Sequence, residues 1–241
     1  MTNIKIFWHV NELGGWNQVM DQQWDLINSS GLRDAVSEIN ICMNGQPWTF
    51  VNWLQSKNTQ DPEGKIKLVN VNKDAAYHEW PTLMFMLQKA KETTEPFHIC
   101  YIHLKGLLRY GDPNVGDWRD FMNWATIEKW RENVAALDGG AEAVGTNYNT
   151  EPWPHFAGNF WWARSDYIAK LEPIAHPEDR LNHNFTQFTR HPTNPHWRFD
   201  HEAWLHSKSP KYVELARSLE PGERHYRERY PKENYISKLK S

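Results

Sequence analysis

The chain has 241 residues and a formal net charge of −3, so it is long enough for one α/β domain with a sizeable core. The small negative charge argues against a protein that binds nucleic acid through a strong general field, because such domains carry a marked positive excess. A mean hydropathy of −0.79, with no run of roughly 18 to 20 apolar residues, predicts that the chain has no membrane span.

The two cysteines, Cys42 and Cys100, lie in apolar runs and are too few for a disulfide scaffold. We expect them to be buried free thiols in strands, as in proteins of a reducing compartment. The first residues enter a strand without the apolar core of a secretion signal, which favours a cytoplasmic location.

Strand and helix patterns alternate along the first 150 residues. Apolar runs predict strands at residues 4–10, 38–43, 65–72, 98–103 and 143–147. Apolar residues at three- and four-residue spacing predict helices at residues 16–27, 79–91 and 117–137. This alternation is typical of an α/β fold with a mostly parallel, Rossmann-type central sheet flanked by helices, and its ligand sites lie at the carboxyl ends of the strands.

The carboxyl-terminal part of the chain has a different composition. After Pro173 it is rich in His, Pro, Asn and Arg, which predicts an irregular stretch wrapped on the same domain. Residues 224–240 mix charged residues and Tyr at helical spacing, so we expect a surface helix there, or else an acceptor-binding arm. We therefore predict one domain at residues 1–206 and a helical extension at residues 207–241 packed on it.

Polar residues end the strand predicted at residues 98–103. His103 and Lys105 alternate with apolar residues, so their side chains face the same side, at an edge where α/β proteins bind ligands. Lys105 could meet a diphosphate as a point charge, and His103 could bind a phosphate, a sugar hydroxyl or a metal. The alternative is that both are the solvated end of a strand.

An aromatic segment at residues 153–164 is the second candidate. Gly158 allows a close backbone approach, Asn159 offers a donor and an acceptor to sugar hydroxyls, and Arg164 could pair with phosphate. Adjacent tryptophans could present a flat apolar face to a sugar ring, unless residues 160–167 only build a strand and a helix. The residues that we expect to contact sugar or acceptor are His155, Gly158, Asn159, Trp161, Trp162 and Trp204.

A carboxylate beside a tryptophan follows in residues 198–204. Glu202 is our first candidate for a general base that takes a proton from an acceptor hydroxyl, and Asp200 is the second. A solvated Glu at a helix start is the competing interpretation. Phosphate-binding glycine loops, nucleophile elbows and cysteine zinc patterns are absent, and the 12 histidines do not match a zinc pair, so we assign no metal ligand.

With these residues in view, residues 1–206 resemble glycosyltransferases of the GT-A type, in particular the short ones of large DNA viruses, phages and bacterial surface-glycan clusters. The family pattern Gly-x5-Arg-x2-Tyr/Phe-x2-Leu, followed by an acidic acceptor base, fits Gly158, Arg164, Tyr167 and Glu202, with Leu171 one place off the usual spacing. The segments that carry the resemblance are residues 6–10, 30–32, 101–106, 158–164 and 202–204.

The chain departs from the family at one position. GT-A enzymes place an Asp-x-Asp at the end of a central strand to hold a divalent metal, and here His103-Leu104-Lys105 stands in that place. Either Lys105 neutralises the diphosphate without Mn²⁺ or Mg²⁺, or the metal ligands come from elsewhere, such as Asp112, Asp117 or a histidine. We favour weak or absent metal dependence.

The resemblance implies a hexosyl- or pentosyltransferase that uses a nucleoside diphosphate sugar as donor and a glycan or another hydroxyl compound as acceptor. Its nucleotide-sugar site would comprise His9, Val10, Asn44, Gly45, His103, Lys105, Gly106 and Arg164. The alternatives are a carbohydrate-binding protein with a degenerate transferase fold and a phage-type DNA-base glycosyltransferase. The modest acidity disfavours nucleic acid as a partner, although the basic carboxyl-terminal segment leaves it open.

Overall fold

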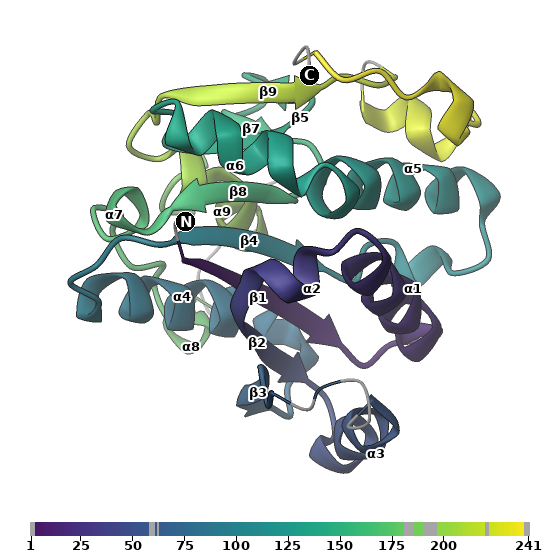
Figure 1. Cartoon of the computed structure of the whole chain (residues 1–241), viewed down its shortest axis with the longest axis vertical. Helices are drawn as coiled ribbons and strands as arrows, with labels where there is room; N and C mark the ends of the chain where they lie inside the picture. Colours follow the sequence, from purple (N-terminus) through teal and green to yellow (C-terminus); the bar gives the residue numbers. More distant parts are fainter. Residues whose placement is uncertain are drawn as a thin grey trace.

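A computed structural model describes residues 3–57, 61, 63–180, 186–189, 197–219 and 222–238. Within these residues, a central sheet of seven strands has the order β3-β2-β1-β4-β8-β5-β9 (Figure 1). A second, two-stranded sheet pairs β6 with β7. The strands are β1 (Ile4–Asn11), β2 (Val36–Asn44), β3 (Ile66–Asn72), β4 (His98–His103), β5 (Ala143–Thr146), β6 (Tyr148–Asn149), β7 (His155–Phe156), β8 (Trp161–Arg164) and β9 (Tyr212–Ala216).

The helices that flank the sheet are α1 (Trp16–Ser29), α2 (Leu32–Ala35), α3 (Pro47–Lys57), α4 (Trp80–Glu92), α5 (Pro113–Asn123), α6 (Trp130–Asp138), α7 (Ser165–Ile168), α8 (Pro177–Arg180) and α9 (Asp200–Ala203). Short 3₁₀ turns occupy Ala75–Tyr77, Leu107–Arg109, Trp197–Phe199, Trp204–His206, Gly222–Tyr226 and Lys232–Asn234. None of the helices in the described part of the chain combines the length and the apolar character that a bilayer span requires.

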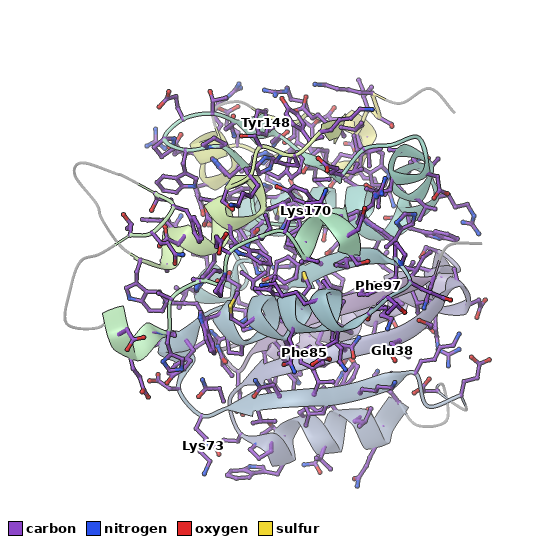
Figure 2. The ribbon with its side chains drawn as sticks, turned by 90° about the vertical axis from the view of Figure 1, so that its left-hand side faces the viewer. Glu38, Lys73, Phe85, Phe97, Tyr148 and Lys170 are labelled. Carbon is purple, nitrogen blue, oxygen red and sulfur yellow. The ribbon has the colours of Figure 1, made fainter. Side chains whose placement is uncertain are left out.

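The predicted α/β class and mostly parallel sheet are confirmed. β3, β2, β1 and β4 run parallel to one another, and β5 is parallel to β9. β8 is antiparallel to both of its neighbours, β4 and β5. Viewed from the side, Lys73, just after the edge strand β3, and Tyr148 of β6 lie toward opposite ends of the molecule (Figure 2).

Alternation along the strands divides the core between the two faces of the sheet. Ile6, Trp8 and Val10 of β1 pack on the face covered by α1, α3, α5 and α6. Phe7, on the other face, joins a second cluster formed with α4 and α7. Cys42 and Cys100 are buried free thiols, as expected. Strands buried on both faces explain why the apolar runs of β1 and β4 were nearly continuous.

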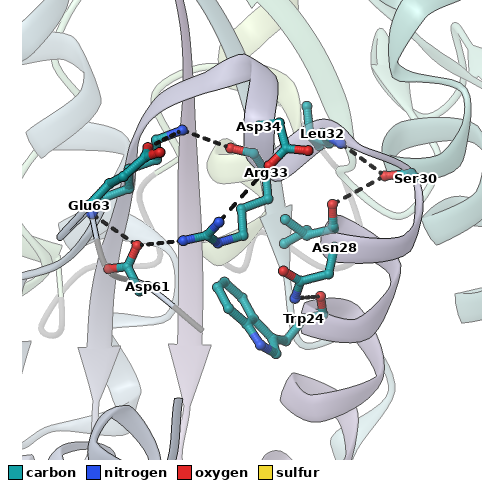
Figure 3. Close-up of polar contacts among 10 residues, drawn as sticks. Trp24, Asn28, Ser30, Leu32, Arg33, Asp34, Asp61 and Glu63 are labelled. Atoms are coloured by element: carbon teal, nitrogen blue, oxygen red, sulfur yellow. Dashed lines mark hydrogen bonds and ion pairs between the residues drawn. The ribbon is translucent and has the colours of Figure 1, made fainter. Parts of the chain in front are cut away.

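The turn after α1 is fixed at the amino ends of the strands. The Arg33 guanidinium donates to Asp61 at 3.1 Å, and the Lys65 ammonium donates to the Arg33 carbonyl at 3.1 Å (Figure 3). Asp61 also accepts from the backbone of Lys65 and Ile66. These bonds join the starts of β2 and β3.

Two predicted helices differ from the structure. The helix expected at 117–137 is broken by a π-helical turn at Trp124–Glu128, in which the Lys129 N–H bonds the Trp124 carbonyl five residues earlier. The side chain of Asn133 donates to the Ala125 carbonyl that this turn leaves free. The extension expected to be helical instead begins with β9, which completes the sheet beside β5.

The surface helix expected at 224–240 is also absent from the described residues. Gly222–Tyr226 and Lys232–Asn234 are 3₁₀ turns, and Pro231 separates them. Asp117 of α5 holds this segment by accepting two hydrogen bonds from Arg229, at 2.6 and 2.9 Å, and one from the Tyr230 N–H. We call residues 222–235 the C-terminal strap.

The three tryptophans assigned to a sugar surface lie in the core instead. Trp161, Trp162 and Trp204 are each at most 1% exposed. Their indole N–H groups donate within the protein, to the Asn159 side chain and to the carbonyls of Thr126 and Glu172 respectively. Neither ring face nor N–H is left for a sugar, so this part of the prediction is wrong.

We predict that Trp162→Phe lowers the free energy of unfolding by about 2 kcal/mol, because it removes buried volume and leaves the Thr126 carbonyl without its donor. Chemical denaturation measures this change. Trp48→Phe is the control, because Trp48 is 60% exposed, and we expect it to change stability by less than about 0.5 kcal/mol. Equal stability of the Trp162 variant and the wild type would contradict the core assignment.

Candidate functional site

The candidate site is a cavity of about 240 Å³ at the carboxyl ends of β1 and β4. Within the sheet, β2 and β3 lie on one side of β1, whereas β4 lies on the other side of β1. This is the point where strand order reverses, and open α/β sheets bind ligands there. Described residues from both strand ends, from the loop before α4, from the loop before β8, from α9 and from the C-terminal strap line the cavity.

Two histidines come together at the base of the cavity because of strand register. His9 of β1 pairs with His103 of β4, and both odd-numbered residues point to the α4 face. His9 Nδ1 lies 2.9 Å from the Thr82 hydroxyl of α4. His103 Nε2 donates to the Gly158 carbonyl at 2.7 Å. The sequence prediction named both histidines, and the cavity contains both.

Both imidazoles are neutral at neutral pH. Burial lowers the pKa of His9 to about 3. Burial also lowers the pKa of His103, and the positive charge of Lys105 acts in the same direction. Because His103 Nε2 carries the proton that it donates, its Nδ1 is unprotonated. The base of the cavity therefore holds polar groups without a fixed charge.

Two cations enter the cavity from the turn after β4. Lys105 Nζ lies 4.4 Å from the centre of the Trp118 ring, and the Arg109 guanidinium lies 4.5 Å from that of Tyr226. Neither has a carboxylate within ion-pair distance among the residues that the structure describes. The turn between them requires a glycine at position 106. Gly106 has a φ of 81°, which favours glycine, and a Cβ there would lie 2.4 Å from the Val115 side chain.

Two carboxylates line the same cavity in different environments. Glu79, just before α4, places one oxygen 3.2 Å from His201 Nδ1. Burial by itself raises the pKa of Glu79, but the hydrogen bond from His201, and the positive charges of His103, His201 and His9 when they are protonated in acid, hold it well below its usual range. Glu202 of α9 is half-buried and has no hydrogen bond or ion pair with any described residue.

Asp200, the second candidate for a base, has a structural position. It is fully buried and accepts hydrogen bonds from the backbone N–H groups of Gln187, Phe188 and Thr189. A carboxylate that is enclosed and saturated in this way cannot reach an acceptor hydroxyl. It holds α9 in place, and Glu202 is carried by the same helix.

The loop before β8 also lines the cavity. Gly158, with a φ of 81°, has no room for a side chain, because a Cβ would lie 2.1 Å from Met122 Sδ. Asn159 has a φ of 58° and uses its side chain within the protein, accepting from Trp161 and donating to the His201 carbonyl. Both residues shape the cavity, but the amide of Asn159 is already bonded.

Several predicted site residues lie elsewhere. Because β8 is antiparallel, Arg164 pairs with His98 at the start of β4, at the opposite end of the sheet, and it bonds Asp166. Val10 is buried in the core. The remaining three do not line the cavity. Asn44 donates to the His78 carbonyl, Gly45 packs against Glu12, and His155 bonds the Trp153 carbonyl.

Other lining residues were not found from the sequence. Asn11 is the last residue of β1, His78 and Glu79 lie between β3 and α4, Arg109 follows the turn at Gly106, and Tyr226 belongs to the C-terminal strap. Glu79 precedes Trp80-Pro81 and was interpreted only as the start of a helix. His78 carries the clearest local sign, a φ of 45° in a non-glycine residue, but this is visible only in the structure.

The side chains at the expected metal position do not fit a divalent cation. Lys105 is itself a cation, and His103 donates a proton through Nε2. Asp112 caps α5 and Asp117 binds Arg229, so neither alternative carboxylate faces the cavity. Among the described residues, no group of three His, Cys, Asp or Glu side chains has the geometry of a metal site.

The low pKa of His9 predicts acid sensitivity. Below pH 6.5 the unfolded chain binds a proton that the folded chain does not bind until about pH 3, so stability falls as the pH decreases through this window. Between pH 7.5 and pH 5 the His9 contribution is about 2 kcal/mol. We expect His9→Gln to lose correspondingly less stability over this range in denaturant titrations. An equal pH-dependent loss in both proteins would contradict the prediction.

The solved structures similar in architecture include the crystal structure of 4-diphosphocytidyl-2C-methyl-D-erythritol synthase from Anaerococcus prevotii DSM 20548. It is 12% identical, the match covers 91% of this chain and 90% of that chain, and the TM-score is 0.46. No curated protein matches the sequence. A family model described as "Domain of unknown function (DUF8361)" matches residues 5–213. The chain therefore belongs to the DUF8361 family.

Proposed function

We propose that this protein is a glycosyltransferase that moves a sugar from a nucleoside diphosphate sugar to an acceptor hydroxyl. The observation that carries the proposal is the charge arrangement of the cavity. Lys105 and Arg109 have no carboxylate partner among the described residues, and the same cavity contains Glu202, which has no partner there either. Unpaired cations suit a diphosphate, and an unpaired carboxylate suits an acceptor proton.

The reaction needs two charge changes, and the cavity has groups for both. Glu202 accepts the proton of the acceptor hydroxyl while the oxygen of that hydroxyl attacks the anomeric carbon of the sugar. The bond between that carbon and the diphosphate oxygen breaks, and the diphosphate leaves with the electron pair. Lys105 and Arg109 stabilise the negative charge that develops on the leaving group.

Glu202 is a better base than Glu79 for a physical reason. His201 already donates to Glu79, and the pKa of Glu79 is held well below its usual range, which makes Glu79 a weak proton acceptor. No described residue donates to Glu202, so an acceptor hydroxyl can occupy that place. His9 and His103 are neutral, so the positive charge offered to the diphosphate comes from Lys105 and Arg109.

The donor is proposed to bind without a divalent metal, with Lys105 and Arg109 providing the positive charge. The cation–π contacts support this role, because each cation rests on an aromatic ring and is held near the cavity without being neutralised. The nucleoside would extend toward His9 and Asn11, and the sugar toward Gly158 and Glu202, all of which line the cavity.

The binding half of the proposal is tested by titration calorimetry with UDP, GDP, CDP and dTDP and their glucose conjugates. We expect one of the four nucleoside diphosphates and its glucose conjugate to bind, with the same affinity in EDTA and in Mn²⁺. Lys105→Ala should weaken the binding of both about 10-fold or more, because a charged contact to the diphosphate is lost. Lys73→Ala, just after β3 and outside the cavity, is the control. Wild-type affinity in the Lys105 variant would refute the diphosphate role, and a response to glycans alone would favour a carbohydrate-binding protein.

The transfer half is tested with Glu202→Gln. We expect this variant to keep nucleotide affinity and to lose 100-fold or more of its turnover, about the usual scale for loss of a general base. Hydrolysis of the nucleotide sugar provides an assay while the acceptor is unidentified, since water can replace the acceptor. Unchanged turnover would remove Glu202 from the mechanism. Glu95→Gln, exposed and outside the cavity, should behave as the wild type.

A further inference from the structure

The two carboxylates of the cavity have different numbers of engaged oxygens. One oxygen of Glu79 lies 3.2 Å from His201 Nδ1, and the other has no hydrogen-bond partner among the described residues. The side chain is 22% exposed, and it lines the cavity. Glu79 therefore presents one hydrogen-bond acceptor to a ligand while its second oxygen is held by the protein.

The position of this acceptor is fixed from both sides. Glu79 directly precedes α4, which packs against β1 through the second core cluster. Its partner His201 has no exposed side-chain surface and belongs to α9, which Asp200 ties to residues 187–189. A carboxylate held between two packed helices does not need to be ordered when a ligand binds, so little entropy is lost.

Its chemistry also differs from that of a base. The pKa of Glu79 lies well below its usual range, so the group stays ionised and only accepts hydrogen bonds. An anionic acceptor is repelled by a diphosphate and attracted by hydroxyl donors. Within one ligand that contains both, the hydroxyl-bearing part is the part that can lie against Glu79.

We propose that Glu79 is a specificity residue that accepts hydrogen bonds from hydroxyl groups of the transferred sugar, an inference that rests on the proposed glycosyl transfer. Glu79 and Glu202 then have separate tasks, one in recognising the sugar and the other in removing the acceptor proton. The donor class is narrowed to nucleotide sugars with a free hydroxyl at the position that Glu79 contacts. A charged hydrogen bond of this kind discriminates against the deoxy analogue by about 10- to 100-fold.

The test compares two ligands that differ only in the sugar. Titration calorimetry measures the Glu79→Gln variant with the nucleoside diphosphate that the wild type binds and with its glucose conjugate. We expect affinity for the glucose conjugate to fall about 10-fold or more, with affinity for the nucleoside diphosphate unchanged within about twofold. Lys105→Ala should weaken both ligands, and Glu95→Gln neither. Equal affinities in Glu79→Gln and the wild type, or equal losses for both ligands, would overturn the assignment.

A second measurement does not depend on the variant's stability. The wild type is titrated with the monodeoxy forms of the glucose conjugate, and we expect at least one of them to bind about 10-fold more weakly than the parent. Equal binding of all of them would overturn the role of Glu79 and leave the diphosphate site intact. If the wild type binds neither nucleoside diphosphates nor their sugars, the proposed function fails first.

Discussion

The parallel pairing of β1 with β4 is the constraint on which the site depends. One register places His9 beside His103, and the two-residue alternation turns both toward α4 while Trp8 and Ile102 point to the other face. A shift of one residue would bury different side chains and move Lys105 away from the cavity. The apolar residues of these strands therefore determine where the polar ones lie, because burial on both faces permits a single register.

The polar groups around this pairing form a connected set that joins distant parts of the chain. His103 donates to the Gly158 carbonyl, Asn159 donates to the His201 carbonyl, and His201 meets Glu79. Strand β4, the loop before β8, α9 and the loop before α4 are thus linked through side chains in the cavity wall. Each link satisfies a group that burial would otherwise leave unpaired, so stability and site geometry have the same cause.

The sequence was informative where local pattern and burial agree. Apolar runs located β1, β2, β3, β4 and β5, and the rule for strand ends led to His103 and Lys105. The sequence pattern at residues 160–164 led to a wrong prediction of a sugar-binding aromatic face. Trp161 and Trp162 point to opposite faces of the sheet, and both faces of strand β8 are buried. The chemistry of its guanidinium suggested Arg164 as a phosphate ligand, but the antiparallel direction of β8 takes it to the opposite end of the sheet, beside the start of β4. Glu79 and Tyr226 were missed because only long-range packing brings them to the cavity.

The C-terminal strap has a consequence for how the site is assembled. Tyr226 contacts Arg109, and His225 stacks with an interplanar angle of 6° on Trp118, the ring that Lys105 also contacts. The strap is held by Asp117 and by the ion pair of Lys232 with Glu128 rather than by strand pairing. A chain synthesised only as far as β9 has the strands of the central sheet and the residues of the cavity base. It lacks the rings of His225 and Tyr226, which contact Trp118 and Arg109. The cavity is therefore complete only once the strap has emerged from the ribosome and docked on α5.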